Sequence, residues 1–115
     1  MKATIYHNPR CSTSRNTLER MREGGVEPTI VEYLKDPPSK TRLKKLIKDA
    51  GISVRDAMRR KEAVYAELKL DNPKLTDDQL LEAMVANPIL IERPIVETTK
   101  GVRLCRPIEK VQEIL

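Results

Sequence analysis

A cysteine at position 11 lies where the sequence changes from a strand pattern to a helix pattern. Thr4-Ile5-Tyr6 is typical of a strand, Pro9 interrupts it, and hydroxyl residues follow Cys11. A helix N-terminus presents unpaired amides and the positive end of the helix dipole, which stabilise a thiolate and bind oxyanions. The stretch is therefore predicted to provide a nucleophilic sulfur and an anion-binding loop together.

The sequence favours this role of Cys11 over two alternatives. Free cysteines are often buried core residues, but the neighbours of Cys11 are polar. A Cys-x-x-Cys redox motif would have its second cysteine at position 14, where the chain has Ser14, so Cys11 needs an external reductant. Cys105 is interpreted as a core thiol, because neighbouring residues of a strand face opposite ways and Arg106 is a candidate for the site.

His7 and Ser14 are candidates to support the thiolate. His7 is the only histidine and comes four residues before Cys11, at the carboxyl end of the predicted strand. Its imidazole could stabilise the thiolate or lie at the surface, and the spacing does not decide between the two. Ser14 could donate to the thiolate, but helix capping is the default expectation for Ser12, Thr13 and Ser14.

The composition limits the class of protein. The 115 residues suit a single domain, and the core must be aliphatic because the chain has no Phe and no Trp. No apolar run approaches the ~20 residues of a membrane span, and a strand follows Met1 directly, with no signal peptide pattern. We therefore expect a cytoplasmic protein. Two distant cysteines with no metal-ligand spacing predict neither a disulfide framework nor a metal site. A thiolate nucleophile with an external reductant needs no bound cofactor, so none is expected.

The net charge of +5 is concentrated in one segment. Residues 40–61 hold nine Lys or Arg against two Asp, a net charge of +7, which leaves −2 for the rest of the chain. Such a segment can attract an anionic partner, or it can be a solvated helix face. No aromatic residues alternate with the lysines, which favours the solvated face and predicts no nucleic-acid partner.

The order of predicted elements indicates an α/β fold. A β-α-β half is followed by helices over about 39–87 and then by a β-β-α half. This is the connectivity of a thioredoxin-like fold, with a mixed four-stranded sheet and a helical insertion in a single domain, 1–115. Strands are predicted at 2–6, at 28–34 and at 102–106, and the stretch 89–96 leads into a further strand. Helices are predicted after Cys11, from 39 to 51, after Ser53, over 62–68, from Thr76 to 87, and from Pro107 as the first helical residue.

Three arginines could together bind an anion, although the residues alone do not single out this set. Taken singly, Arg59, Arg93 and Arg106 are ordinary surface charges. As a set they suit a tetrahedral oxyanion, because guanidinium groups donate two parallel hydrogen bonds and stay charged. In thioredoxin-like folds the residue before a cis-proline faces the active cysteine, and Arg93 precedes Pro94.

Over essentially its whole length the chain resembles the glutaredoxin-coupled arsenate reductases of the thioredoxin-like superfamily. Ser12 is a departure, since some members have glycine there. The matching motifs are His7-Asn8-Pro9 with Cys11, Thr13-Ser14-Arg15-Asn16-Thr17-Leu18, Glu27-Pro28-Thr29-Ile30, Tyr33-Leu34, Pro37-Pro38-Ser39, Gly51-Ile52-Ser53-Val54-Arg55, Thr76-Asp77-Asp78-Gln79-Leu80, Asn87-Pro88-Ile89-Leu90-Ile91, Arg93-Pro94-Ile95-Val96 and Arg103-Leu104-Cys105-Arg106-Pro107.

The resemblance implies that the chain reduces arsenate to arsenite, with glutathione as co-substrate and a glutaredoxin as electron donor. It implies these roles: Cys11 as nucleophile, His7 and Ser14 tuning the thiolate, Arg59, Arg93 and Arg106 binding arsenate, and Pro94 as the cis-proline.

Two alternatives remain open. Related non-enzymatic regulators that bind RNA polymerase share the Arg-Pro-Ile element and the arginine near position 59. His7 ahead of Cys11 and the presence of Arg106 favour the reductase, because a regulator needs no third anion-binding arginine. A glutathione-dependent thiol enzyme with another substrate would use the same residues.

Overall fold

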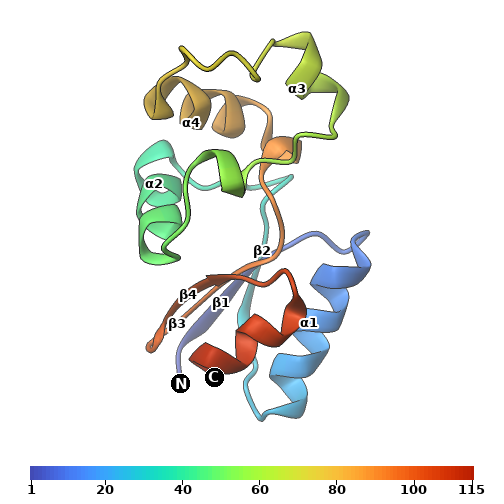
Figure 1. Ribbon diagram of the computed structural model, residues 1–115. Coiled ribbons are helices and arrows are strands. Elements are labelled where there is room, and N and C mark those ends of the chain that lie inside the picture. The colour runs from blue at the N-terminus through green and yellow to red at the C-terminus, as the bar shows by residue number, and fades with distance from the viewer. The chain divides into compact units, whose positions relative to one another are not determined.

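The computed structural model describes residues 1–115, and its contacts divide the chain into two units. Met1–Asp36 and Arg93–Leu115 form the first unit, and Pro37–Glu92 forms the second. Only the first unit contains the sheet, and the second consists of helices and their connections (Figure 1). The predicted helical insertion falls within the second unit, and the single-domain assignment stays a prediction.

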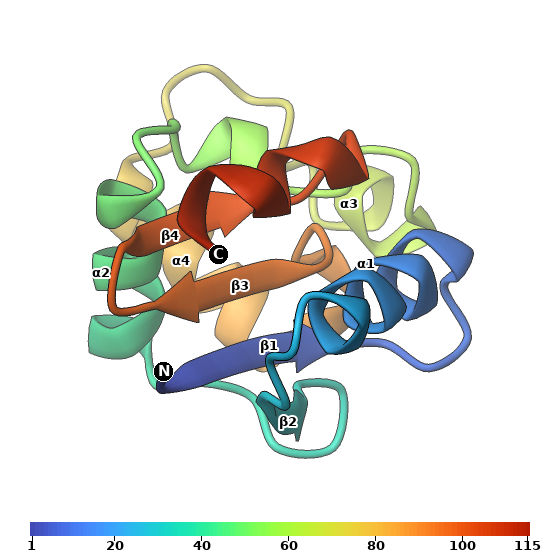
Figure 2. The same ribbon diagram turned by 90° about the horizontal axis from the view of Figure 1, so that it is seen from below.

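The sheet has four strands in the order β2-β1-β3-β4 (Figure 2). The strands are β1 (Ala3–His7), β2 (Thr29–Glu32), β3 (Ile95–Thr98) and β4 (Gly101–Leu104). β1 and β2 are parallel, whereas β3 is antiparallel to both β1 and β4. This mixed sheet confirms the predicted thioredoxin-like fold. It also brings the ends of β1, β2 and β4 and the start of β3 to one edge.

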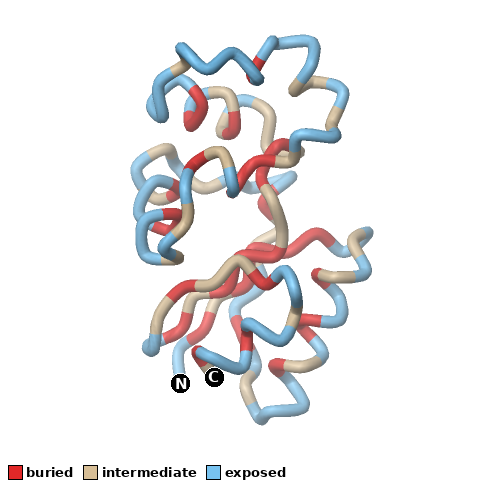
Figure 3. Tube along the Cα trace, viewed as in Figure 1, coloured by how far each residue is buried: buried red, intermediate tan, exposed pale blue.

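One face of the sheet packs against two helical elements of the same unit, α1 (Ser12–Glu23) and η3 (Ile108–Ile114). The side chains buried between the sheet and these two helices are mainly aliphatic, and burial of each Leu-sized residue stabilises the unit by about 1.5–3 kcal/mol. Cys105 lies among them with no exposed surface, which confirms it as a core thiol. Figure 3 shows the buried positions along these strands. The core residues are Ala3, Ile5, Leu18, Met21, Val96, Cys105, Val111 and Ile114.

The start of α1 differs from the prediction. The N-cap is Cys11 itself, with φ −93° and ψ 120°, and none of the three hydroxyl residues that follow it caps the helix. The cause is the preceding turn, in which the Cys11 N–H donates to the Asn8 carbonyl at 3.0 Å. Pro9 lies at the second position of this turn, which suits its fixed φ. The turn ends at Cys11, so Ser12 is already the first helical residue and cannot be the N-cap.

The second half of the sheet unit also departs from expectation in detail. The third strand begins only at Ile95, and Pro88–Leu90, at the start of the predicted stretch, form a 3-10 helix, η2, in the other unit. The predicted closing α-helix is the 3-10 helix η3, and Pro107 is its N-cap rather than its first helical residue. With φ −70° and ψ 163°, Pro107 is still extended.

The second unit is stabilised by the packing of α2 (Lys40–Asp49) and α4 (Asp77–Ala86). α4 begins after Thr76, where the sequence predicts a helix start, with a capping box in which the Gln79 N–H donates to Thr76 Oγ1 at 3.2 Å and the Thr76 N–H donates to Gln79 Oε1 at 2.9 Å. The remaining elements are η1 (Arg55–Ala57), α3 (Ala63–Glu67) and η2. The buried residues of the two main helices are Leu43, Leu46, Ile47, Leu80, Leu81 and Met84.

Part of the basic segment's charge is compensated inside the second unit. Lys40 Nζ lies 2.6 Å from a carboxylate oxygen of Asp78, and Lys45 Nζ lies 2.8 Å from one of Asp49. Surface pairs of this kind contribute about 0–1 kcal/mol each, so they lower the local field more than they stabilise the fold. No helix is both long and apolar enough to cross a membrane. No group of three or more His, Cys, Asp or Glu side chains is arranged to hold a metal ion.

Candidate active site

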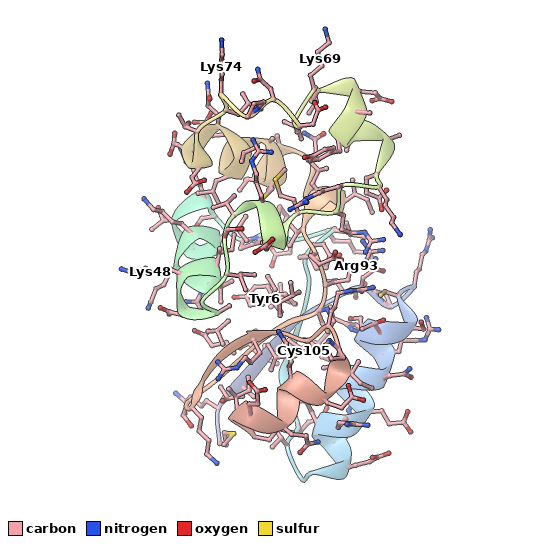
Figure 4. All side chains as sticks on the ribbon, in the orientation of Figure 1. Tyr6, Lys48, Lys69, Lys74, Arg93 and Cys105 are labelled. Carbon is pink, nitrogen blue, oxygen red and sulfur yellow. The ribbon has the colours of Figure 1, made fainter.

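Three of the predicted site residues meet at one edge of the sheet. Cys11 follows β1, Arg93 comes shortly before β3, and Arg106 follows β4. The antiparallel pairing of β3 with both neighbours brings these points together. Arg106 Nη1 donates to the Arg93 carbonyl at 3.0 Å, and Figure 4 shows Arg93 at the end of the sheet where α1 begins. The nucleophile and two cations therefore share one end of the unit.

The proline after Arg93 is in the conformation that the resemblance implied. The Arg93–Pro94 peptide bond is cis. The Pro94 carbonyl accepts from the Cys105 N–H at 2.9 Å, so the start of β3 is fixed to the end of β4. The Arg106–Pro107 bond is also cis, which the sequence did not indicate. Both arginines of this edge therefore precede a cis-proline.

Asn8 organises the loop before Cys11 and was not predicted as a site residue. It is 4% exposed, and besides its carbonyl contact with Cys11 its Oδ1 accepts from the Arg10 N–H at 3.0 Å. Arg15 Nη1 donates to the Pro9 carbonyl at 2.9 Å and closes the loop from the helix side. An asparagine before proline at the end of a strand is a turn signal, and it could have marked Asn8 as a structural residue of the site.

The surroundings of Cys11 favour its thiolate. Partial burial would raise the pKa of the Cys11 thiol, but the Ser14 amide, the Arg93 side chain and the Thr13 amide outweigh this effect and lower the pKa below its ordinary value. The amides belong to the first turn of α1, so they are the unpaired donors of a helix N-terminus. Cys11 is partly exposed, so an external substrate can reach it.

Ser14 and His7 form a buried pair next to the loop. Ser14 Oγ and His7 Nδ1 are 2.6 Å apart, and the Asn8 N–H donates to the same Oγ at 3.1 Å. Ser14 has no exposed surface, and the capping role expected for it is wrong. Burial lowers the pKa of His7, with Glu32 opposing, so the imidazole is neutral near pH 7. A neutral His7 offers the loop a hydrogen bond and no positive charge, and its effect on the thiolate stays a prediction.

Arg59, the third predicted arginine, belongs to the second unit. Its guanidinium donates to the carboxylates of Glu62 at 3.2 Å and Glu92 at 2.7 Å. Burial acts to lower the pKa of Arg59, but these two carboxylates raise it above its ordinary value. An oxyanion at Arg59 has to compete with both carboxylates, and its role in anion binding stays a prediction.

The lowered pKa of Cys11 makes its reactivity a measurable prediction. We expect the rate of alkylation by iodoacetamide to rise with a midpoint below ~8.5, the ordinary value for a cysteine thiol. Since the pKa of Cys11 is lower in the folded state than in the unfolded state, ionisation stabilises the fold at high pH. This stabilisation disappears as the pH falls through the folded-state pKa.

Cys105 is the internal control for this measurement. It has no exposed surface, and burial raises the pKa of its thiol to about 12. Mass spectrometry of the native protein should locate the label on Cys11 alone. A midpoint at or above that of a free thiol would contradict the electrostatic account of the site.

Comparison with known proteins identifies the family. A model of the ArsC family matches residues 6–114, so the chain belongs to the ArsC family. An arsenate reductase of Rhizobium meliloti (strain 1021) is 55% identical over all of this chain and 82% of that protein. An arsenate reductase of Escherichia coli (strain K12) is 58% identical over 97% of this chain and 79% of that protein.

The solved structures include the same fold. An arsenate reductase from Vibrio cholerae aligns with a TM-score of 0.96 and 46% identity, covering 100% of this chain and 98% of that chain. The thioredoxin-like architecture therefore has a close counterpart among arsenate reductases.

Proposed function

We propose that this protein reduces arsenate to arsenite with Cys11 as the nucleophile. The observation that supports this function best is a partly exposed thiol of lowered pKa beside the Arg93 guanidinium. A thiolate and a fixed cation at one edge are suited to attack on an anionic centre. The curated relatives named above are arsenate reductases, and they share more than half of their aligned residues with this chain.

In the first step the Cys11 thiolate attacks arsenic(V) and displaces water or hydroxide from the oxyanion. Arg93 and Arg106 neutralise the charge of the oxyanion, and Arg59 is the third arginine of the proposed set. His7 and Ser14 keep the loop and the thiolate in place through their hydrogen bond. Phosphate is expected to bind in the same place without turnover, because phosphorus accepts sulfur poorly.

In the second step the sulfur–arsenic bond breaks and arsenic is reduced. A glutathione thiolate attacks the Cys11 sulfur, and the electron pair of the sulfur–arsenic bond leaves with arsenic as arsenite. Cys11 and glutathione are then joined in a mixed disulfide, so each sulfur has given up one electron. A glutaredoxin thiolate attacks this disulfide and releases the Cys11 thiolate. Because position 14 is Ser14, the chain has no resolving cysteine in this loop.

The donor system is tested by arsenate-dependent oxidation of NADPH with glutathione, glutaredoxin and glutathione reductase. We expect full turnover only when all components are present, and omission of glutaredoxin alone should remove most of the rate. Full turnover with a thioredoxin system in place of glutathione and glutaredoxin would contradict the proposed donor.

A further inference from the structure

Tyr33 places an unsatisfied hydroxyl at the edge of the sheet that holds Cys11. It directly follows β2, and because β2 is parallel to β1, this position lies at the same edge as the loop after β1. The Tyr33 side chain has no exposed surface, and its Oη has no hydrogen-bond partner. A buried hydroxyl without a partner costs free energy, so its presence suggests a state of the protein in which it is bonded.

The polar neighbours of this hydroxyl belong to the site. Burial raises the pKa of Tyr33. The charge of Arg93 and the polar side chains of Asn8 and Arg93 partly oppose this rise, because they lie near enough to interact with the phenol oxygen without a hydrogen bond of regular geometry. The Cys11 thiolate adds to the rise. The phenol of Tyr33 is therefore close to the Cys11 thiol and to the Arg93 guanidinium, which also interacts with Cys11. It also remains protonated and neutral at physiological pH, so it leaves the positive charge of Arg93 intact.

The shape of a guanidinium explains what the hydroxyl can do. Arginine has five N–H donors in one plane, and a tetrahedral oxyanion takes two of them along one edge. The other donors need acceptors when the group is partly buried, as Arg93 is. A phenol oxygen has lone pairs that can accept such a bond, which fixes the plane of the guanidinium relative to the anion.

We propose that Tyr33 is a positioning residue for oxyanion binding, whose hydroxyl accepts a hydrogen bond from the Arg93 guanidinium when an anion occupies the site. The inference rests on the proposed function only in that Arg93 binds the oxyanion. It deepens that function, because it adds a neutral residue to a site so far described by its charges.

The test compares Tyr33→Phe with Tyr6→Phe, which removes the hydroxyl of another buried tyrosine of the same unit. Phosphate binding is measured by the protection of Cys11 from iodoacetamide. We expect Tyr33→Phe to raise the apparent Kd for phosphate and the KM for arsenate about tenfold, equivalent to about 1.4 kcal/mol. The Cys11 pKa should stay unchanged, and the unfolding temperature without anion should stay equal or rise. Tyr6→Phe should leave the phosphate Kd as in the original protein.

Three results would overturn the inference. One is unchanged phosphate affinity in Tyr33→Phe, with or without a lower unfolding temperature, which assigns the hydroxyl a structural role. Another is a raised Cys11 pKa with unchanged affinity, which means that the hydroxyl serves the thiolate. The third is no protection of the original protein by phosphate or arsenate. Protection without arsenate turnover would instead overturn the proposed reduction and leave the role of Tyr33 intact.

Discussion

Replacement of Cys11 by Ser is expected to lower the rate of arsenate reduction by at least about a thousandfold. A serine hydroxyl ionises far less readily than a thiol, so the first turn of α1 can no longer stabilise an anion at position 11. The oxygen also cannot form a mixed disulfide, so the electron pair needed to reduce arsenic is not available from this residue. The measurement is arsenate-dependent NADPH oxidation in the coupled assay, on protein shown to be folded by circular dichroism.

Cys105→Ala is the matched control for this prediction. Cys105 lies in the core cluster with no exposed surface, and a raised pKa keeps its thiol protonated. Its replacement removes packing but no reacting group, so we expect a loss of stability of about 1 kcal/mol and most of the turnover retained. Loss of turnover in Cys105→Ala together with its retention in Cys11→Ser would reverse the assignment of the two thiols.

Replacement of Arg93 by Ala is expected to lower kcat/KM for arsenate by about a hundredfold to a thousandfold. Removal of one preorganised donor group to a developing charge costs this much in other enzymes. The pKa of Cys11 should rise as well, because Arg93 is one of the groups that lower it. The measurements are the arsenate dependence of turnover and the pH dependence of Cys11 alkylation.

Two further variants separate charge from geometry. Arg93→Lys keeps the positive charge but cannot form two parallel hydrogen bonds. Compared with Arg93→Ala, it should keep most of the lowering of the Cys11 pKa but recover only part of kcat/KM. Arg103→Ala removes an arginine of the same unit whose Nε donates to Glu113 at 2.8 Å, and it should leave both values unchanged. Equal losses in Arg93→Ala and Arg103→Ala would show that net charge matters and not the position of Arg93.

The sequence was sufficient to predict the fold class because the hydrophobic periodicity and the positions of the turn residues indicate the same strands and helices. The order of strands and helices along the chain and the start of α4 at Thr76 follow from local signals that tertiary contacts do not override. The lone cysteine at the start of α1 was predicted for the same reason, since a strand, a proline and a helix must place it at a turn.

The parts that were missed depend on how individual side chains pack and pair in the folded loop, which residue type and spacing do not specify. Ser14 has the composition of a helix cap, and only its packing against His7 and Asn8 makes it a buried partner instead. Tyr33 looks like an ordinary core aromatic until its hydroxyl is found without a partner. Neither fact depends on the residue types nearby, so periodicity and propensity could not reveal them.

The most direct test of the account is to measure the arsenic species after arsenate is incubated with the protein and reduced glutathione and glutaredoxin. Chromatographic separation of arsenate from arsenite reports the reaction itself, without coupling enzymes. We predict arsenite in proportion to the protein present, and none above background with Cys11→Ser. Absence of arsenite from folded protein whose Cys11 is reactive towards iodoacetamide would contradict the claim that this thiol reduces arsenate.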